Sequence, residues 1–219
     1  MSQLDGVRGL AILAVIIHHF LTHNINLIFA SLGTVGVQLF FVASGFLITG
    51  ILVRCRESIL RNNTNIFHEI KTFYIRRSIR IFPLYYISLV TLIVFSAPDI
   101  REYALWLSTY TINLKMIDQE WMIATAAHFW SLAIEEQFYL IWPWIVLLLP
   151  FRWSLAISIF LVLAAIVTRS YYVYTWILLD YGDNLGAWMS TASNFDSLGI
   201  GSGIALAIHI GIANQCMYS

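Results

Sequence analysis

The sequence predicts an all-α protein, a polytopic transmembrane helical bundle that crosses the membrane about six or seven times within one domain, residues 1–219. Of its 219 residues, 59% are hydrophobic and only 11% are charged, whereas a soluble chain needs more charge to cover its surface. Eight Trp and eleven Tyr supply the amphipathic rings that gather where a bilayer meets water. The net charge is zero, so composition gives no reason to expect nucleic-acid binding.

The first expected span runs from Asp5 to His23 and is apolar from Val7 to Leu21 apart from Arg8, His18 and His19. A helix turns about 100° per residue, so Arg8 and His19 return to within about 20° of one face, roughly 16 Å apart along the axis. This spacing puts a cation at one membrane surface and an imidazole near the midplane, where ionisable groups indicate function. The structural alternative is that Arg8 extends to the headgroups while His19 hydrogen-bonds a neighbouring helix.

The second expected span, Gly33 to Val53, is rich in small residues that allow close helix packing, and Ser44 could also hydrogen-bond toward a site. The segment from Arg54 to Arg80 holds seven of the twelve basic residues. Such a cluster of positive charge predicts a cytoplasmic loop. Because two spans precede this loop, the N-terminus and Arg8 are also expected in the cytoplasm.

Arg77 and Arg80 are three residues apart and share a helix face just before the third expected span, Phe82 to Ala97. The planar fork of donors on arginine suits phosphate groups. The pair could therefore hold a pyrophosphate at the cytoplasmic surface. The alternative is a basic juxtamembrane anchor for anionic lipids.

Two adjacent carboxylates, Glu135 and Glu136, lie within the otherwise apolar, span-like segment from His128 to Leu149. Neighbouring residues on a helix point about 100° apart, so the two glutamates cannot line one narrow site equally. One could orient a histidine while the other pairs with an arginine or caps a helix. A pair of carboxylates within the membrane favours a functional interpretation.

Three further stretches complete the expected helices. The stretch from Tyr103 to Met116 could be either a short span or an interfacial helix. The next runs from Trp153 to about Val173. The last, Phe195 to Ile212, contains a run of glycines that predicts close helix packing, and Asp196 is expected to cap its start.

Four segments, in order along the chain, resemble signature motifs of the membrane acyltransferase 3 family, whose members O-acylate cell-envelope glycans and some small molecules. They are LDGVRG with His19, VGVQLFFVASGFLI, FYIRRSIRIFPLYY and HFWSLAIEEQFYLIWP. A fifth segment resembles one that begins with arginine in the family. Here it begins with Asn194, so no role is carried over to that residue. Family members commonly have more spans, and the resemblance therefore implies that this chain lacks the last ones.

The resemblance implies an integral membrane O-acyltransferase that moves an acyl group, most often acetyl, from cytoplasmic acyl-CoA (acetyl-CoA) to a hydroxyl of a cell-envelope glycan or small molecule. The implied catalytic residues are His19, Glu135 and Glu136, and the implied ligands of the CoA phosphates are Arg8, Arg77 and Arg80. A hydroxyl nucleophile needs a base, and histidine titrates near neutrality. His19 would be that base or a transient acyl acceptor, oriented by one of the glutamates.

We expect the chain in the inner (plasma) membrane, with lipid, acyl-CoA and the acceptor as partners. No metal is expected, because His19 and His23 have the helical spacing of a metal pair without a supporting motif. Two other function classes stay open. A transporter or flippase would also place ionisable groups within the membrane. A truncated, non-catalytic scaffold would bind no CoA and would depend on a second polypeptide.

Overall fold

The computed structural model is helical throughout the part of the chain that it describes. It describes the backbone of residues 2–21, 27–62, 64–95, 98–119, 126–179 and 184–218, and the side chains of residues 6–18, 32–62, 64–95, 100–119, 126–178 and 184–211. The long helices are α1 (Ser2–Leu21), α2 (Leu27–Asn62), α3 (Ile66–Phe95), α7 (Phe129–Leu148), α8 (Phe151–Leu179) and α10 (Thr191–Tyr218). The short helices are α4 (Pro98–Glu102), α5 (Ala104–Ser108), α6 (Ile112–Gln119) and α9 (Leu185–Met189).

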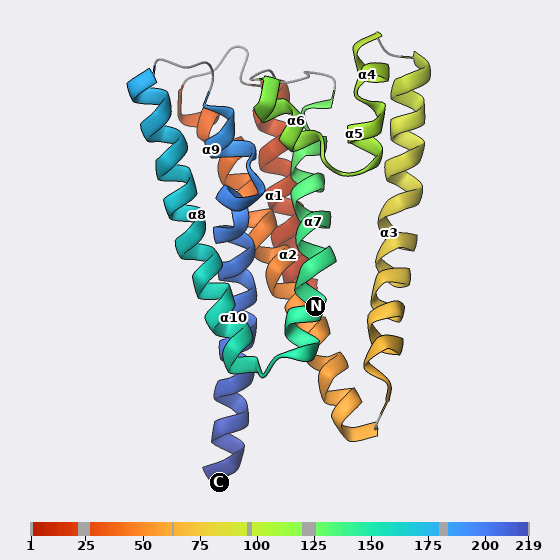
Figure 1. Ribbon diagram of the computed structural model, residues 1–219, viewed down its shortest axis with the longest axis vertical. Coiled ribbons are helices and arrows are strands. Elements are labelled where there is room, and N and C mark those ends of the chain that lie inside the picture. The colour runs from red at the N-terminus through yellow and green to blue at the C-terminus, as the bar shows by residue number, and fades with distance from the viewer. Residues whose placement is uncertain are drawn as a thin grey trace.

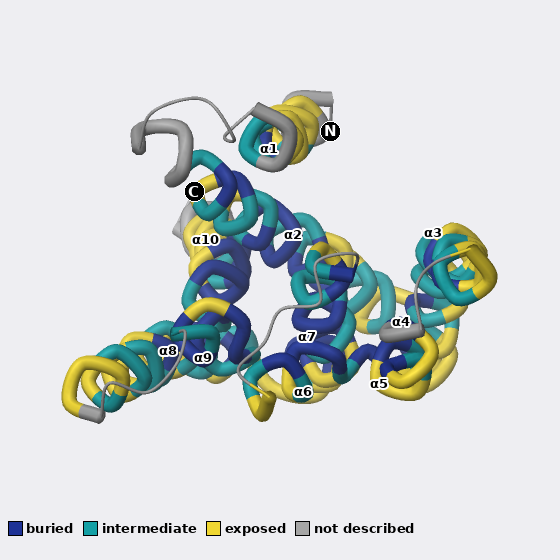
Figure 2. The backbone as a smooth tube through the Cα atoms, turned by 90° about the horizontal axis from the view of Figure 1, so that it is seen from above, coloured by how far each residue is buried: buried dark blue, intermediate teal, exposed yellow. Residues whose placement is uncertain are grey.

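The long helices run side by side along the long axis of the molecule, and the short ones gather at one end (Figure 1). We call this end, which carries α9, the α9 end. The opposite end, where α2 turns into α3, is the basic end. Helix α2 packs most extensively against α10 and α1, and α10 also packs against α8. Helix α3 lies at the edge of the bundle, away from α1, α8 and α10 (Figure 2).

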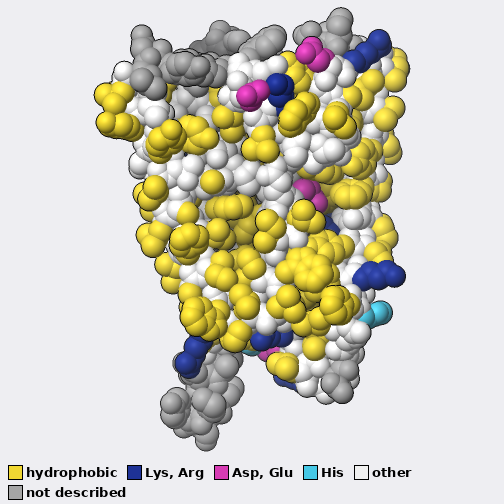
Figure 3. Space-filling view, in the orientation of Figure 1, with side chains coloured by type: hydrophobic (Ala, Val, Ile, Leu, Met, Phe, Trp, Pro, Cys, Tyr) yellow, Lys and Arg dark blue, Asp and Glu magenta, His cyan; other side chains and the backbone are white. Residues whose placement is uncertain are grey.

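Among the residues that the structure describes, three helical segments are long and apolar enough to cross a membrane, namely Leu32–Asn62, Ile66–Phe95 and Phe151–Leu178, with mean hydropathies of 2.1, 1.8 and 2.0. Hydrophobic side chains cover the middle of the face shown in Figure 3, whereas most of the charged side chains on that face lie toward the two ends. A belt of exposed apolar side chains is unfavourable in water and favourable in lipid. The chain is therefore an integral membrane protein, and six or seven spans remain a prediction.

The segment from Arg54 to Arg80, predicted as a loop, is almost entirely helical. Helix α2 continues to Asn62, and α3 begins at Ile66. No Gly or Pro interrupts the end of α2. The start of α3 is capped by Asn65, whose side-chain oxygen accepts a 2.9 Å hydrogen bond from the backbone N–H of Phe67.

The stretch from Tyr103 to Met116 is neither a continuous span nor a single interfacial helix. It is divided between α5 and α6, and Tyr110 between them has a φ of 56°. The Tyr110 ring stacks on that of Tyr85, with the ring centroids 4.3 Å apart. The Tyr85 hydroxyl donates a 2.6 Å hydrogen bond to the Leu107 carbonyl. Contacts from α3 thus stabilise a break that local sequence does not reveal.

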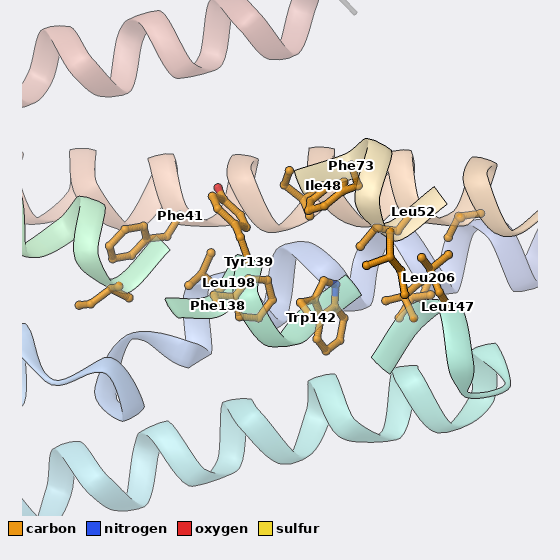
Figure 4. Packing of buried hydrophobic residues seen from close by; sticks show 14 residues of the cluster. Phe41, Ile48, Leu52, Phe73, Phe138, Tyr139, Trp142, Leu147, Leu198 and Leu206 are labelled. Atoms are coloured by element: carbon orange, nitrogen blue, oxygen red, sulfur yellow. The ribbon is translucent and has the colours of Figure 1, made fainter. Parts of the chain in front are cut away.

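The main hydrophobic core lies between α2, α7 and α10, with Phe73 of α3 at its side (Figure 4). Phe41, Trp142 and Leu198 are almost completely buried there. The Trp142 indole N–H donates a 2.8 Å hydrogen bond to the Thr49 hydroxyl, so the polar atom of this buried ring has a partner. This packing fixes the face of α7 that carries Glu135 against α2.

Candidate functional site

Glu135 lies in the interior of the bundle, and its exposed fraction is 2%. The Tyr139 hydroxyl, one turn later on α7, donates a 2.9 Å hydrogen bond to Oε1 of Glu135. The hydroxyl of Ser44 on α2 lies beside both groups. The Glu135 carboxyl group is therefore held between α7 and α2.

Glu136 faces α3 instead. Its Oε1 lies 3.9 Å from Nε of Arg77, and these side chains are only 15% and 12% exposed, respectively. That distance is too long for a hydrogen bond. The Arg77 guanidinium also lies over the Tyr139 ring, 4.0 Å from its centroid. The two glutamates thus have different partners, in line with the 100° step between neighbouring helical residues.

Two adjoining cavities near these carboxylates carry a concentration of positive charge. One, of about 260 Å³, lies next to Ser44 and Tyr139, and the other is about 480 Å³; they share Arg77 and Arg80. We call the two together the basic cavity. Its arginines are Arg8, Arg54, Arg76, Arg77 and Arg80. The three arginines predicted to bind CoA therefore line one continuous site.

Several polar atoms at the basic cavity lack hydrogen-bond partners. Six buried side-chain nitrogen or oxygen atoms of the described residues have none. Three of the six belong to residues that line it, namely Arg8 Nε, Ser44 Oγ and Arg77 Nε, and a fourth, Glu136 Oε1, faces Arg77. Because buried polar groups are normally hydrogen-bonded, such a concentration indicates a place for a ligand that supplies the missing partners.

Helix α1 connects the basic cavity with a second one. Arg8 lines the basic cavity, and its guanidinium lies 5.0 Å from the centroid of the Phe40 ring. Toward the other end of α1, His18 lines a cavity at the α9 end. The backbone of His19 is part of α1, but its side chain lies outside the described residues. The meeting of His19 with a glutamate therefore stays a prediction.

The second cavity, which we call the α9 cavity, measures about 340 Å³. Its polar side chains are Thr34, His18, Gln38, His128, Ser131, Arg169 and Asn194, and its tryptophans are Trp130 and Trp188. The His18 ring fits against Gly33 of α2, where an added Cβ would lie 2.5 Å from the ring. Sequence reasoning gave His18 and Gln38 no role in a site, because only the packing of α1, α2 and α7 around the cavity brings them together.

Arg169 of α8 pairs with Asp196 of α10, with Nη1 2.8 Å from Oδ2, and donates a hydrogen bond to the Ser193 carbonyl. The expectation that Asp196 caps a helix is wrong, because α10 begins earlier, at Thr191. The Asn194 amide donates to the carbonyls of Trp188 and Ser190 at 2.7 and 2.9 Å. These bonds join the end of α9 to the first turn of α10.

Gln137, which follows the two glutamates on α7, forms hydrogen bonds to α6, to the turn before it and to the start of α10. Its side-chain nitrogen donates to the Tyr110 carbonyl at 2.7 Å and to Oδ1 of Asn113 at 3.0 Å. Its side-chain oxygen accepts a hydrogen bond from the Thr191 hydroxyl. The residue thus links α6, α7 and α10. In the sequence, only its place directly after Glu136 pointed to Gln137 as part of the site.

Comparison with known proteins gives a consistent result. The family model described as an acyltransferase domain matches residues 1–212. The chain is 35% identical over 157 residues to the peptidoglycan O-acetyltransferase of Listeria monocytogenes. These aligned residues cover 65% of this chain and 24% of that protein. It is 34% identical over 154 residues to a putative peptidoglycan O-acetyltransferase of Bacillus subtilis, and these residues cover 64% of this chain and 23% of that protein.

A putative O-acetyltransferase of Staphylococcus aureus is 33% identical over 156 residues, which cover 65% of this chain and 24% of that protein. The matched part of this chain thus spans about a quarter of the length of these curated relatives. No solved structure matches the chain.

Proposed function

The chain belongs to the acyltransferase domain family, and from this premise we propose that it moves an acetyl group from acetyl-CoA to a hydroxyl of a cell-envelope glycan. The observation that carries the proposal is the basic cavity, where Arg8, Arg77 and Arg80 meet beside the buried Glu135 and the partly buried Glu136. The printed names of two relatives include peptidoglycan, which makes that polymer the first acceptor to test.

The basic cavity suits the donor because CoA carries a diphosphate and a further phosphate. Guanidinium groups bind such anions through paired, charge-assisted hydrogen bonds. The adjoining cavities bring five arginines together, against a single lining carboxylate, Glu69. The positive-inside rule assigns this end of the bundle, and the N-terminus with it, to the cytoplasm, where acyl-CoA is made.

The transfer would follow ordinary acyl chemistry. His19 takes the proton of the acceptor hydroxyl, whose oxygen attacks the thioester carbonyl carbon of acetyl-CoA. The carbon–sulfur bond breaks, and the CoA thiolate takes the proton back, leaving an acetyl ester and free CoA. Glu135 would orient the His19 imidazole and stabilise its protonated form. Arg77 would hold a phosphate of the donor while Glu136 fixes the guanidinium.

Binding of acetyl-CoA to the purified full chain tests the donor site directly. We expect an Arg77→Ala/Arg80→Ala variant to bind at least about tenfold more weakly, because it loses two charge-assisted contacts. The matched control is Arg61→Ala/Arg152→Ala, which removes two exposed arginines that line none of the described cavities and should bind normally. A well-folded wild type that binds no acetyl-CoA would contradict the proposal and favour a scaffold or a transporter.

A further inference from the structure

We infer that the α9 cavity binds the acceptor, as an uncharged, hydroxyl-rich sugar, at a site separate from the donor in the basic cavity. The inference rests on the proposed function and adds the place and chemical class of its second substrate. The cavity volume of about 340 Å³ lies within the range of small-molecule sites. The cavity is lined by residues of α9 and by Gly33 near the start of α2, at the end of the bundle opposite the turn into α3 (Figure 1).

The lining of the α9 cavity combines flat aromatic faces with hydrogen-bonding groups. Trp130 and Trp188 offer apolar ring faces, on which the C–H faces of a sugar ring can pack. Imidazole, amide, hydroxyl and guanidinium groups surround them, and no carboxylate is among the lining residues. The hydroxyl of Thr34 and the amide of Gln38 can each both donate and accept hydrogen bonds, so they match the mixed donor and acceptor pattern of sugar hydroxyls.

The two cavities differ in the net charge of the side chains that line them. Arg169 is the one Arg or Lys side chain among the residues that line the α9 cavity, and its charge is already balanced by Asp196 at 2.8 Å. Its second terminal nitrogen donates to the Ser193 carbonyl. The cavity thus has little positive charge to offer the phosphates of CoA, whereas the basic cavity has a large excess. A polyanionic donor and a neutral acceptor would each find one favourable site.

Hydrogen bonds hold the aromatic wall in place. Asn194 is only 4% exposed, and its amide donates to the Trp188 carbonyl at 2.7 Å. This bond fixes the end of α9, while the Trp188 side chain remains accessible, with 52% of its residue surface exposed. Asn194 is thus a positioning residue for Trp188, a role that its place in the sequence does not reveal.

Helix α1 gives the two sites a physical connection. Arg8 lines the basic cavity, and His18 lines the α9 cavity. His19, the proposed base, follows His18 in the same helix. A hydroxyl that enters from the α9 end and a thioester that enters from the basic end would therefore approach each other along α1.

The test is binding of a soluble, uncharged disaccharide of two N-acetylglucosamine residues to the purified full chain without acetyl-CoA, measured by saturation-transfer NMR. We expect Trp188→Ala to weaken binding by about three- to tenfold, because an aromatic contact is lost. The matched control is Trp153→Ala, which removes a ring that is 65% exposed on α8 and lines none of the described cavities. Gln38→Ala, in the part of the lining that α2 contributes, is a second variant for use if Trp188→Ala fails to fold.

The outcomes separate this inference from the proposed function. The inference is supported if sugar binding falls in Trp188→Ala or Gln38→Ala. Binding must also persist in Trp153→Ala and in the Arg77→Ala/Arg80→Ala variant. No sugar binding by folded wild type, equal binding by all variants, or competition between acetyl-CoA and the sugar would overturn it. Acetyl-CoA binding, measured alone, then still decides whether the donor site exists.

Discussion

The two neighbouring glutamates have different surroundings. Glu135 accepts the Tyr139 hydroxyl and lies against α2, whereas Glu136 faces Arg77 of α3. Helical geometry alone requires that the two diverge. The tertiary structure decides that Glu135 is the inner one, buried where α7 packs on α2.

Replacing Tyr139 by Phe removes the hydrogen bond to Glu135 while keeping the ring under Arg77. We expect acetyl transfer to fall by about tenfold, because a hydrogen bond to a carboxylate contributes roughly 1.5–3 kcal/mol, while acetyl-CoA binding stays near normal. The control is Tyr74→Phe. The Tyr74 hydroxyl donates a 2.7 Å hydrogen bond to the Leu140 carbonyl, and Tyr74 lines none of the described cavities. Equal transfer by wild type and Tyr139→Phe would show that Glu135 needs no such positioning.

Replacing His19 tests the proposed base. His19→Gln should reduce acetyl transfer at least about a hundredfold, since a general base contributes about that much, and should leave acetyl-CoA binding unchanged. The exposed His68 on α3 provides the control, and His68→Gln should transfer normally. Full transfer by His19→Gln at a normal protein level would refute the assignment.

At the scale of helices, glycines set how closely α10 approaches its neighbours. Gly199 and Gly203 face Ser158 of α8, where added Cβ atoms would lie 2.9 Å from its carbonyl oxygen and 3.0 Å from its hydroxyl. On the other face of α10, a Cβ on Gly201 would collide with the backbone of α2 at Val42. The close packing predicted for this run of glycines is therefore present on two faces.

Gly201→Ala should lower the stability of the bundle by about 1–3 kcal/mol, the usual cost of overpacking a fixed backbone contact. Gly211→Ala, at a position where an added Cβ meets nothing within 4 Å, should leave stability unchanged or raise it slightly. Thermal unfolding in detergent would compare the two variants with wild type. A Gly201→Ala protein as stable as Gly211→Ala would contradict the packing argument.

Helix α3 contributes three arginines, Arg76, Arg77 and Arg80, to the basic cavity although it packs only lightly on α2 and α7. At the α9 end, Tyr85 and Tyr86 of α3 donate hydrogen bonds to the carbonyls of Leu107 and Ser108. Toward the basic end, the space between α2 and α3 holds the larger part of the basic cavity.

At the scale of the whole molecule, two cavities of different chemistry lie toward opposite ends of one membrane bundle. The basic cavity collects arginines beside buried carboxylates, and the α9 cavity collects neutral polar groups and tryptophans. Helix α1 reaches both. This arrangement fits a reaction whose donor and acceptor come from opposite sides of a membrane, which is the situation of an enzyme that modifies the cell envelope.

Composition and local motifs were enough for the all-helical membrane class and the family, whereas Arg8 was grouped with Arg77 and Arg80 only through the family resemblance. They sufficed because apolar content, helical periodicity and short motifs are properties of neighbouring residues. Only the tertiary structure decided that Glu136 faces Arg77, that Arg169 pairs with Asp196, that the stretch around Tyr110 folds back, and that an α9 cavity exists. Each of these depends on side chains from helices far apart in the sequence, whose approach is set by packing and not by the hydrogen bonds of any single helix.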